Sequence, residues 1–318
     1  MSNDNAYDPF GFGGYTAEAM NRAGGDTSVV ACELRERVES AFECDSWEMT
    51  SALESIANDL AYFGVYDFKS ANNLLDEIAS APRLNSLEDP SARASVYLAL
   101  ASASDAIASQ HISFDDLIRH RKIGTDPGDQ IPGATRGRTL HFLDLAYDAA
   151  REVPRESSEK AARLISVAEQ AMKVAPDRVP EFLEEARNAA LAATDDMSML
   201  RSATLHAVAK TMLKVDIGRG VEIIDEAVAS AVEENYGFVT SEELIEIANT
   251  VVELDLKRAL ATLSKAVRAL QGRQSDNESK RVCRKLKARV EKYGERNPLY
   301  VRNLLAQVRD LEAELYDF

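Results

Sequence analysis

Two ten-residue segments lie 40 positions apart and are nearly the same, and this internal repeat limits the possible folds more than any other feature. "HFLDLAYDAA" (141–150) and "EFLEEARNAA" (181–190) are identical at five of ten positions, and Asp144 corresponds to Glu184. The match continues downstream, since "VAEQAMKVAPDRVPEFLEEA" (167–186) aligns without gaps with "VAKTMLKVDIGRGVEIIDEA" (208–227). "IANTVVELDLKRALATLSKA" (247–266) follows 39 residues later. The chain therefore repeats one unit about every 40 residues.

Each unit is predicted to form two helices. Apolar residues recur at spacings of one, three and four, as at Leu205, Val208, Ala209 and Met212 in the first helix and Ile223, Ile224, Ala227 and Ala231 in the second. These spacings place them on one face of an α-helix. The break between the two helices contains Asp177, Asp216 or Asp255, each of which we expect to cap the next helix. Two positions of the repeat carry alanine in the aligned copies. Such small side chains let the axes of neighbouring helices approach to about 8–10 Å. They are Ala168, Ala209 and Ala248 in the first helix, and Ala146, Ala186, Ala227 and Ala266 in the second.

A two-helix unit cannot bury its own apolar face, whereas stacked copies can. In this rhythm, and in second helices such as "ALATLSKAV" (259–267), the chain resembles the tetratricopeptide-like and HEAT-like class of α-solenoids over roughly 139–318. The resemblance is looser over 45–110, where "SALESIANDLAYFGVYDFKSANNLLDEI" (51–78) is expected to have three extra residues in its break. The period of 39–41 residues exceeds the tetratricopeptide period, and the Trp, Gly and Tyr of that family's first helix are missing. The resemblance implies a protein-interaction scaffold without chemistry, and we expect an all-α, right-handed α-solenoid of antiparallel helix pairs.

The chain is predicted to have four parts. They are a flexible N-terminal tail (1–25), N-terminal helical repeats (26–110), an insert or loop (111–138) and C-terminal helical repeats with a terminal cap helix (139–318). Gly, Asn and aromatic residues dominate the tail. The insert is expected to begin with a short helix capped by Ser113 and to continue as an exposed loop, because Gly and Pro are frequent after Ile123.

The sequence predicts no catalytic, metal or cofactor site. No Gly-rich loop follows a predicted strand, and the three cysteines, predicted to be packed small hydrophobes of a reduced protein, lack zinc spacing. The segment that contains His111, Asp115, Asp116 and His120 is interpreted as a solvated helix, since a helix would spread these side chains around its axis. His206 is predicted to be packed or half-exposed. No run of eighteen apolar residues and no signal peptide are present, so we expect a cytoplasmic protein without a membrane span.

One basic residue recurs at the start of each predicted second helix. This column consists of Arg138, Arg178, Arg219 and Arg258. An arginine near a helix N-terminus interacts unfavourably with the helix dipole, so each needs a partner. Either each arginine bridges a carboxylate of the neighbouring repeat, or the four form a ladder of guanidinium groups that lines a groove for an acidic peptide.

Charge is divided unevenly along the chain. The formal net charge is −16, yet residues 256–302 contain 14 Lys and Arg against 4 Asp and Glu, which gives +10 there and leaves −26 for the rest. Within this window, 279–294 separates into an apolar and a basic side on a helical wheel. The basic residues that we expect to be available to a partner are Arg281, Arg284, Lys285 and Lys292. This side is either simply solvated or a site for an acidic partner.

These features together predict a non-catalytic scaffold or adaptor for a protein partner, with an acidic partner fitting the basic helix. The alternative is a nucleic-acid-binding accessory protein that uses 279–293. The acidic remainder opposes it, because phosphate affinity depends on Lys and Arg. Contact between the acidic body of one copy and the basic C-terminal segment of another would instead give a head-to-tail homo-oligomer. An enzyme site within 111–138 is the least favoured hypothesis.

Overall fold

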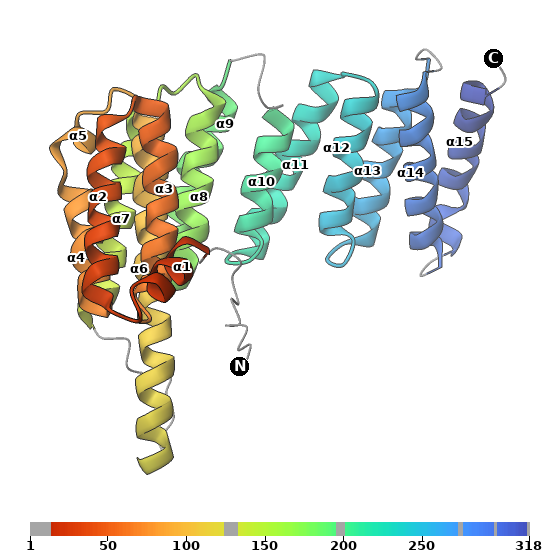
Figure 1. Ribbon diagram of the computed structural model, residues 1–318. Helices are drawn as coiled ribbons and strands as arrows, with labels where there is room; N and C mark the ends of the chain where they lie inside the picture. Colours follow the sequence, from red (N-terminus) through yellow and green to blue (C-terminus); the bar gives the residue numbers. More distant parts are fainter. Residues whose placement is uncertain (1–13, 124–132, 195–200, 273–275, 296–297, 317–318) are drawn as a thin grey trace. The chain divides into compact units, whose positions relative to one another are not determined.

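The computed structural model describes residues 14–123, 133–194, 201–272, 276–295 and 298–316, and gives only the backbone for Gly14, 110–123, 133–135 and Tyr300. These residues form helices and turns, and no strand occurs among them (Figure 1). The all-α class predicted from the apolar spacing is confirmed. No helix in the described part of the chain is both long and apolar enough to cross a membrane.

The chain forms two compact units, which are described separately. The first comprises the described residues of Met1–Pro154 together with Ser166–Val179, and the second comprises Arg155–Ile165 and Pro180–Phe318. Helix α8 (Ser158–Val174) is divided between them.

In the first unit, the long helix α6 lies between α3 and α7, and α4 packs on both α3 and α6. Besides its part of α8, this unit contains α1 (Gly14–Arg22), α2 (Thr27–Glu43), α3 (Ser46–Phe63), α4 (Phe68–Ser80), α5 (Pro82–Asn85), α6 (Pro90–Ile123) and α7 (Gly133–Glu152). Phe63, Leu60 and Leu100 are among the fully buried side chains of this core.

In the second unit, consecutive helices pack as pairs, α10 with α11, α12 with α13 and α14 with α15, and each pair contacts the next (Figure 1). The helices are α9 (Val179–Ala192), α10 (Arg201–Met212), α11 (Ile217–Glu234), α12 (Phe238–Val251), α13 (Leu256–Leu270), α14 (Asn277–Gly294) and α15 (Pro298–Tyr316). All seven alanines of the predicted small columns are fully buried, as close approach of helix axes requires.

Three helix pairs are joined by the same four-residue break, after α3, α10 and α12. Each break ends in an aspartate, Asp67, Asp216 or Asp255, whose Oδ1 accepts a hydrogen bond of 2.9 Å from the backbone N–H three residues later. The N–H of each aspartate in turn donates to the carbonyl four residues earlier. The three extra residues expected in the break of 51–78 are therefore a wrong prediction, because this break has the length of the others.

The predicted cap at Asp177 is also wrong. Pro176–Arg178 form a short 3-10 turn whose N-cap is Ala175, without a side-chain hydrogen bond. When Arg178 is aligned with Arg219, Ala175 falls on the position of Asp216. Because alanine has no acceptor, a tighter turn replaces the capped one.

The predicted flexible tail is helical over Gly14–Arg22, whereas 1–13 lie outside the described residues. Thr16 and Ala19 of α1 are fully buried, and the Thr16 hydroxyl donates to the carbonyl of Asp59 at 3.2 Å. The Arg37 guanidinium lies 4.0 Å from the centre of the Tyr15 ring. Tertiary contacts thus order a segment whose composition indicates flexibility.

The predicted insert at 111–138 is helical at both ends. Helix α6 continues without interruption to Ile123 and α7 begins at Gly133, so Ser113 does not begin a separate helix. No Gly or Pro occurs between Ser91 and Ile123, which explains why nothing ends the helix earlier. Arg136, expected in a loop, donates from Nη2 to the carbonyl of Val174 at 2.8 Å. Residues 124–132 lie outside the described part.

Candidate interaction site

The arginine column forms ion pairs inside the protein. Arg138 makes two hydrogen bonds to Asp76, of 2.9 and 3.0 Å, and Arg178 makes one to Asp144, of 2.6 Å. These pairs lie within the first unit. Each arginine thereby joins the start of one predicted second helix to the preceding one.

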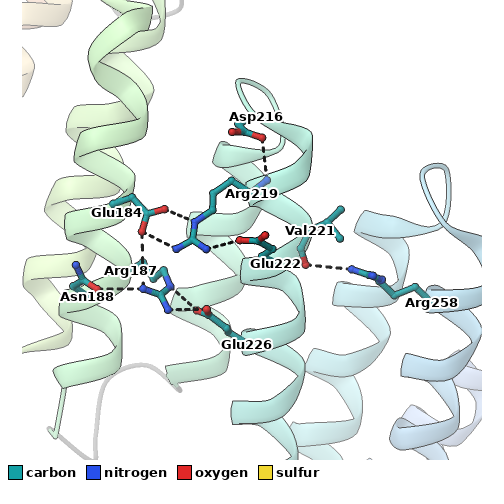
Figure 2. Close-up of polar contacts among 9 residues, drawn as sticks. All are labelled: Glu184, Arg187, Asn188, Asp216, Arg219, Val221, Glu222, Glu226 and Arg258. Atoms are coloured by element: carbon teal, nitrogen blue, oxygen red, sulfur yellow. Dashed lines mark hydrogen bonds and ion pairs between the residues drawn. The ribbon is translucent and has the colours of Figure 1, made fainter.

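The second unit continues the pattern, as Figure 2 shows for Arg219. Arg219 donates from Nη2 to Glu184 of α9 at 2.9 Å and also bonds Glu222 on its own helix. Arg258 lies 3.1 Å from Asp225 of α11. Of the two roles that the sequence left open for this column, the structure places the arginines in the pairs between neighbouring helices.

The acidic partners occupy a column of their own. In the repeat alignment, Asp76, Asp144, Glu184 and Asp225 hold the same position on successive second helices. We call these residues and their arginines the ion-pair ladder. The correspondence of Asp144 with Glu184 was visible in the sequence, but its pairing with the arginines requires knowing which helix faces lie together.

At Glu184, the ion pair with Arg219 favours the charged form of both side chains. The hydrogen bond from Arg219 lowers the pKa of the Glu184 carboxyl, against the opposing effect of partial burial. The same carboxylate, together with Glu222, raises the pKa of Arg219. Arg187 of α9 adds a second two-bond pair to Glu226 of α11, at 2.6 and 2.7 Å (Figure 2). The guanidinium groups of Arg187 and Arg219 are therefore already paired with carboxylates of the protein itself.

The basic helix 279–294 corresponds to α14, and its predicted apolar side is confirmed. Val282, Leu286, Val290 and Tyr293 are buried. Its basic side is less free than the wheel indicates. Arg281 makes bonds of 2.9 and 3.2 Å to Glu242 of α12, and Lys285 lies 2.7 Å from Glu246.

Two of the four predicted partner-binding residues of α14 thus pair with α12, a helix that has acidic and no basic side chains. Their hydrogen bonds lower the pKa of Glu242, that from Arg281 first. Arg284 and Lys292 differ, because both are exposed and neither forms an ion pair with a described residue. The surface of α14 available to a partner therefore contains Arg284 and Lys292.

The remaining reactive side chains are dispersed. His206 of α10 is mostly buried, with Nδ1 2.8 Å from Glu243 and Nε2 2.8 Å from Thr250, so it connects α10 to α12. The predicted packed or half-exposed position is confirmed. Cys283 is buried, and burial raises the pKa of its thiol to about 11, whereas Cys32 is exposed and Cys44 half-buried. The prediction that all three cysteines are packed is wrong for Cys32.

Within the described residues, no group of three or more His, Cys, Asp or Glu side chains is arranged to hold a metal ion. The side chains of His111, Asp115, Asp116 and His120 are not among the described ones. No protein-family model, curated protein or solved structure matches the chain significantly.

Proposed function

We propose that this protein is a non-catalytic helical-repeat scaffold that holds an acidic protein partner. The observation that carries the proposal is the ion-pair ladder, in which successive second helices are tied together by arginine–carboxylate pairs. Such pairs fix the relation of neighbouring helices, and a stack of fixed helices presents a preformed surface. A right-handed solenoid with a period of about 40 residues is the arrangement that we propose for these pairs.

The basic C-terminal region supports an acidic partner. Arg284 and Lys292 of α14 remain exposed after Arg281 and Lys285 pair with α12. Exposed unpaired cations on an otherwise acidic chain speed encounters with acidic surfaces and favour acidic partners over basic ones.

Nucleic-acid binding through α14 is less well supported. Arg281, Lys285 and Lys287 already contact Glu242, Glu246 and Glu312. Phosphate binding would have to compete with these carboxylates, and affinity for nucleic acid depends on the number of cations that neutralise phosphates.

The experiment is a pull-down from native lysate with the full chain, at low and high salt, compared with an Arg284→Glu/Lys292→Glu variant. We expect a stoichiometric protein that the parent retains at low salt and that the variant retains poorly. Retention of nucleic acid in its place, or an identical set of bound proteins for parent and variant, would contradict the proposal.

A further inference from the structure

Helix α13 reverses the charge pattern of the second helices. In the repeat alignment, Asp225 and Glu226 of α11 correspond to Ser264 and Lys265 of α13. The acidic column of the ion-pair ladder therefore ends before α13, and a cation stands where α4, α9 and α11 have glutamate. Arg268 follows on the same helix and is exposed, as is Lys265. Neither forms an ion pair with any residue that the structure describes.

These two cations line a depression within the second unit. It has a volume of about 230 Å³ and lies at the C-terminal end of α11, the first turn of α12 and the last turns of α13. Its lining consists of Val232, Asn235, Thr240, Lys265, Arg268 and Ala269.

The polar groups around the depression are suited to an anion. Thr240 is buried, and its Oγ1 accepts from the N–H of Tyr236 at 2.8 Å. The hydroxyl hydrogen of Thr240 has no acceptor among the described residues, so it is left to donate to a ligand. Helix α12 begins at Phe238, and its N-cap Gly237 offers no side-chain acceptor, so no described side chain caps the first N–H groups of the helix.

Apolar side chains lie beside these donors. Val232, Tyr236 and Val239 are exposed by 47%, 57% and 37%. They come from the end of α11, the turn and the start of α12, and these helices are two of the three that form the depression. A ligand that covers them would need an apolar group next to its anionic one.

The size of the depression limits the kind of ligand. Pockets for cofactors and drug-sized molecules hold about 300–1,000 Å³ and enclose their ligand. A smaller, open depression suits a few side chains of a larger molecule.

We infer that the depression of α11, α12 and α13 binds a carboxylate side chain from an acidic segment of a protein partner. Lys265 and Arg268 donate charge-assisted hydrogen bonds to the carboxylate, and the start of α12 adds the favourable end of its dipole. An apolar residue next to the carboxylate covers Val232 and Tyr236. This inference rests on the proposed scaffold function and specifies the partner's chemistry.

The test uses the full chain and an array of short immobilised peptides. A central Glu, Asp, Gln or phosphoserine is flanked by Phe, Leu or Ser. We expect Glu and Asp peptides with an apolar neighbour to bind best. Replacement by Gln should weaken binding about tenfold or more, since charge-assisted hydrogen bonds are roughly twice as strong as neutral ones.

Two double variants isolate the site. Lys265→Gln/Arg268→Gln should weaken binding of the best peptides about tenfold or more. Lys214→Gln/Lys257→Gln removes the same charge from two exposed positions, one in the break before α11 and one in the first turn of α13, and should bind like the parent. Equal losses in both variants, no acidic-apolar preference, or a preference for phosphoserine would overturn the inference. If the array is silent while the lysate pull-down still yields an acidic partner, the scaffold function stands and only this site assignment falls.

Discussion

At the scale of single residues, the aspartates that end the helix breaks have a clear physical role. Asp216 accepts from the N–H of Arg219, one of the backbone donors at the start of α11 that has no partner inside the helix. Asp67 and Asp255 do the same for α4 and α13. Ala175 cannot, and there the chain forms a 3-10 turn instead.

Removing such a cap should therefore cost stability. We expect Asp216→Ala to lower the free energy of unfolding by about 0.5–2 kcal/mol, the usual cost of losing an N-cap. Asp177→Ala is the control, because Asp177 lies inside the 3-10 turn and is exposed. Urea unfolding followed by circular dichroism measures both, and equal losses would show that the cap hydrogen bond does not matter.

In α11, we expect the packing to require glycine at position 220 but not at position 218. A Cβ at Gly220 would lie 2.7 Å from the Leu213 side chain and 2.8 Å from the Leu213 backbone nitrogen. We expect Gly220→Ala to destabilise by about 1–3 kcal/mol through overpacking. Gly218→Ala meets only the Asp216 carboxylate, at 3.4 Å, and should be neutral or stabilising by up to about 1 kcal/mol. Thermal melts of the two variants give the comparison, and the same melting temperature for both would contradict it.

At the scale of elements, the ion-pair ladder links helices that are not neighbours in sequence. Arg219 and Glu184 are both partly exposed, so their pair should contribute modestly. A double-mutant cycle with Arg219→Gln and Glu184→Gln is expected to give a coupling of about 0.5–1 kcal/mol.

The pH dependence of this coupling has a defined sign. The pKa of Glu184 is lowered from 4.5 in the folded protein. The stabilisation is therefore fully present above pH 4.5 and is lost as the pH falls through the lower folded value. Unfolding measured at neutral pH and at a series of pH values below 4.5 should show the parent's advantage over Glu184→Gln shrinking as the pH falls. A constant difference at every pH would mean that the carboxylate charge has no part in it.

At the scale of the whole molecule, acidic and basic residues are concentrated in different parts of the sequence. Ion pairs between packed helices neutralise part of this separation. Helix α14 supplies cations to the glutamates of α12 and α15. Reversal of the basic side as a set would consequently disturb the fold as well as the surface.

Two reversals separate these effects. Arg281→Glu/Lys285→Glu places carboxylates against Glu242 and Glu246 and should destabilise by about 1–2 kcal/mol. Arg284→Glu/Lys292→Glu should change stability by less than about 0.5 kcal/mol. Thermal melts test this difference. Light scattering from low to high salt tests whether Arg284 and Lys292 also support self-association, which should weaken as salt screens the charges.

The sequence alone determined the helices and their buried faces. Spacings of three and four fix which side of a helix is apolar, whatever lies opposite, so α14 (Asn277–Gly294) lies within two residues of the predicted 279–293. The end of α6 was missed because a Ser-capped helix start and a continuing helix use the same residue types, and only the absence of Gly and Pro favours the latter.

Only the tertiary structure decided which charges remain free. Periodicity placed Arg281 and Lys285 on the polar side of α14 but could not show that α12 presents Glu242 and Glu246 to them. In the same way, the depression beside Lys265 and Arg268 is formed by three helices whose ends meet in space. Ion pairs and cavities depend on distances between segments far apart in the chain, whereas the helical pattern depends on neighbours a few residues away.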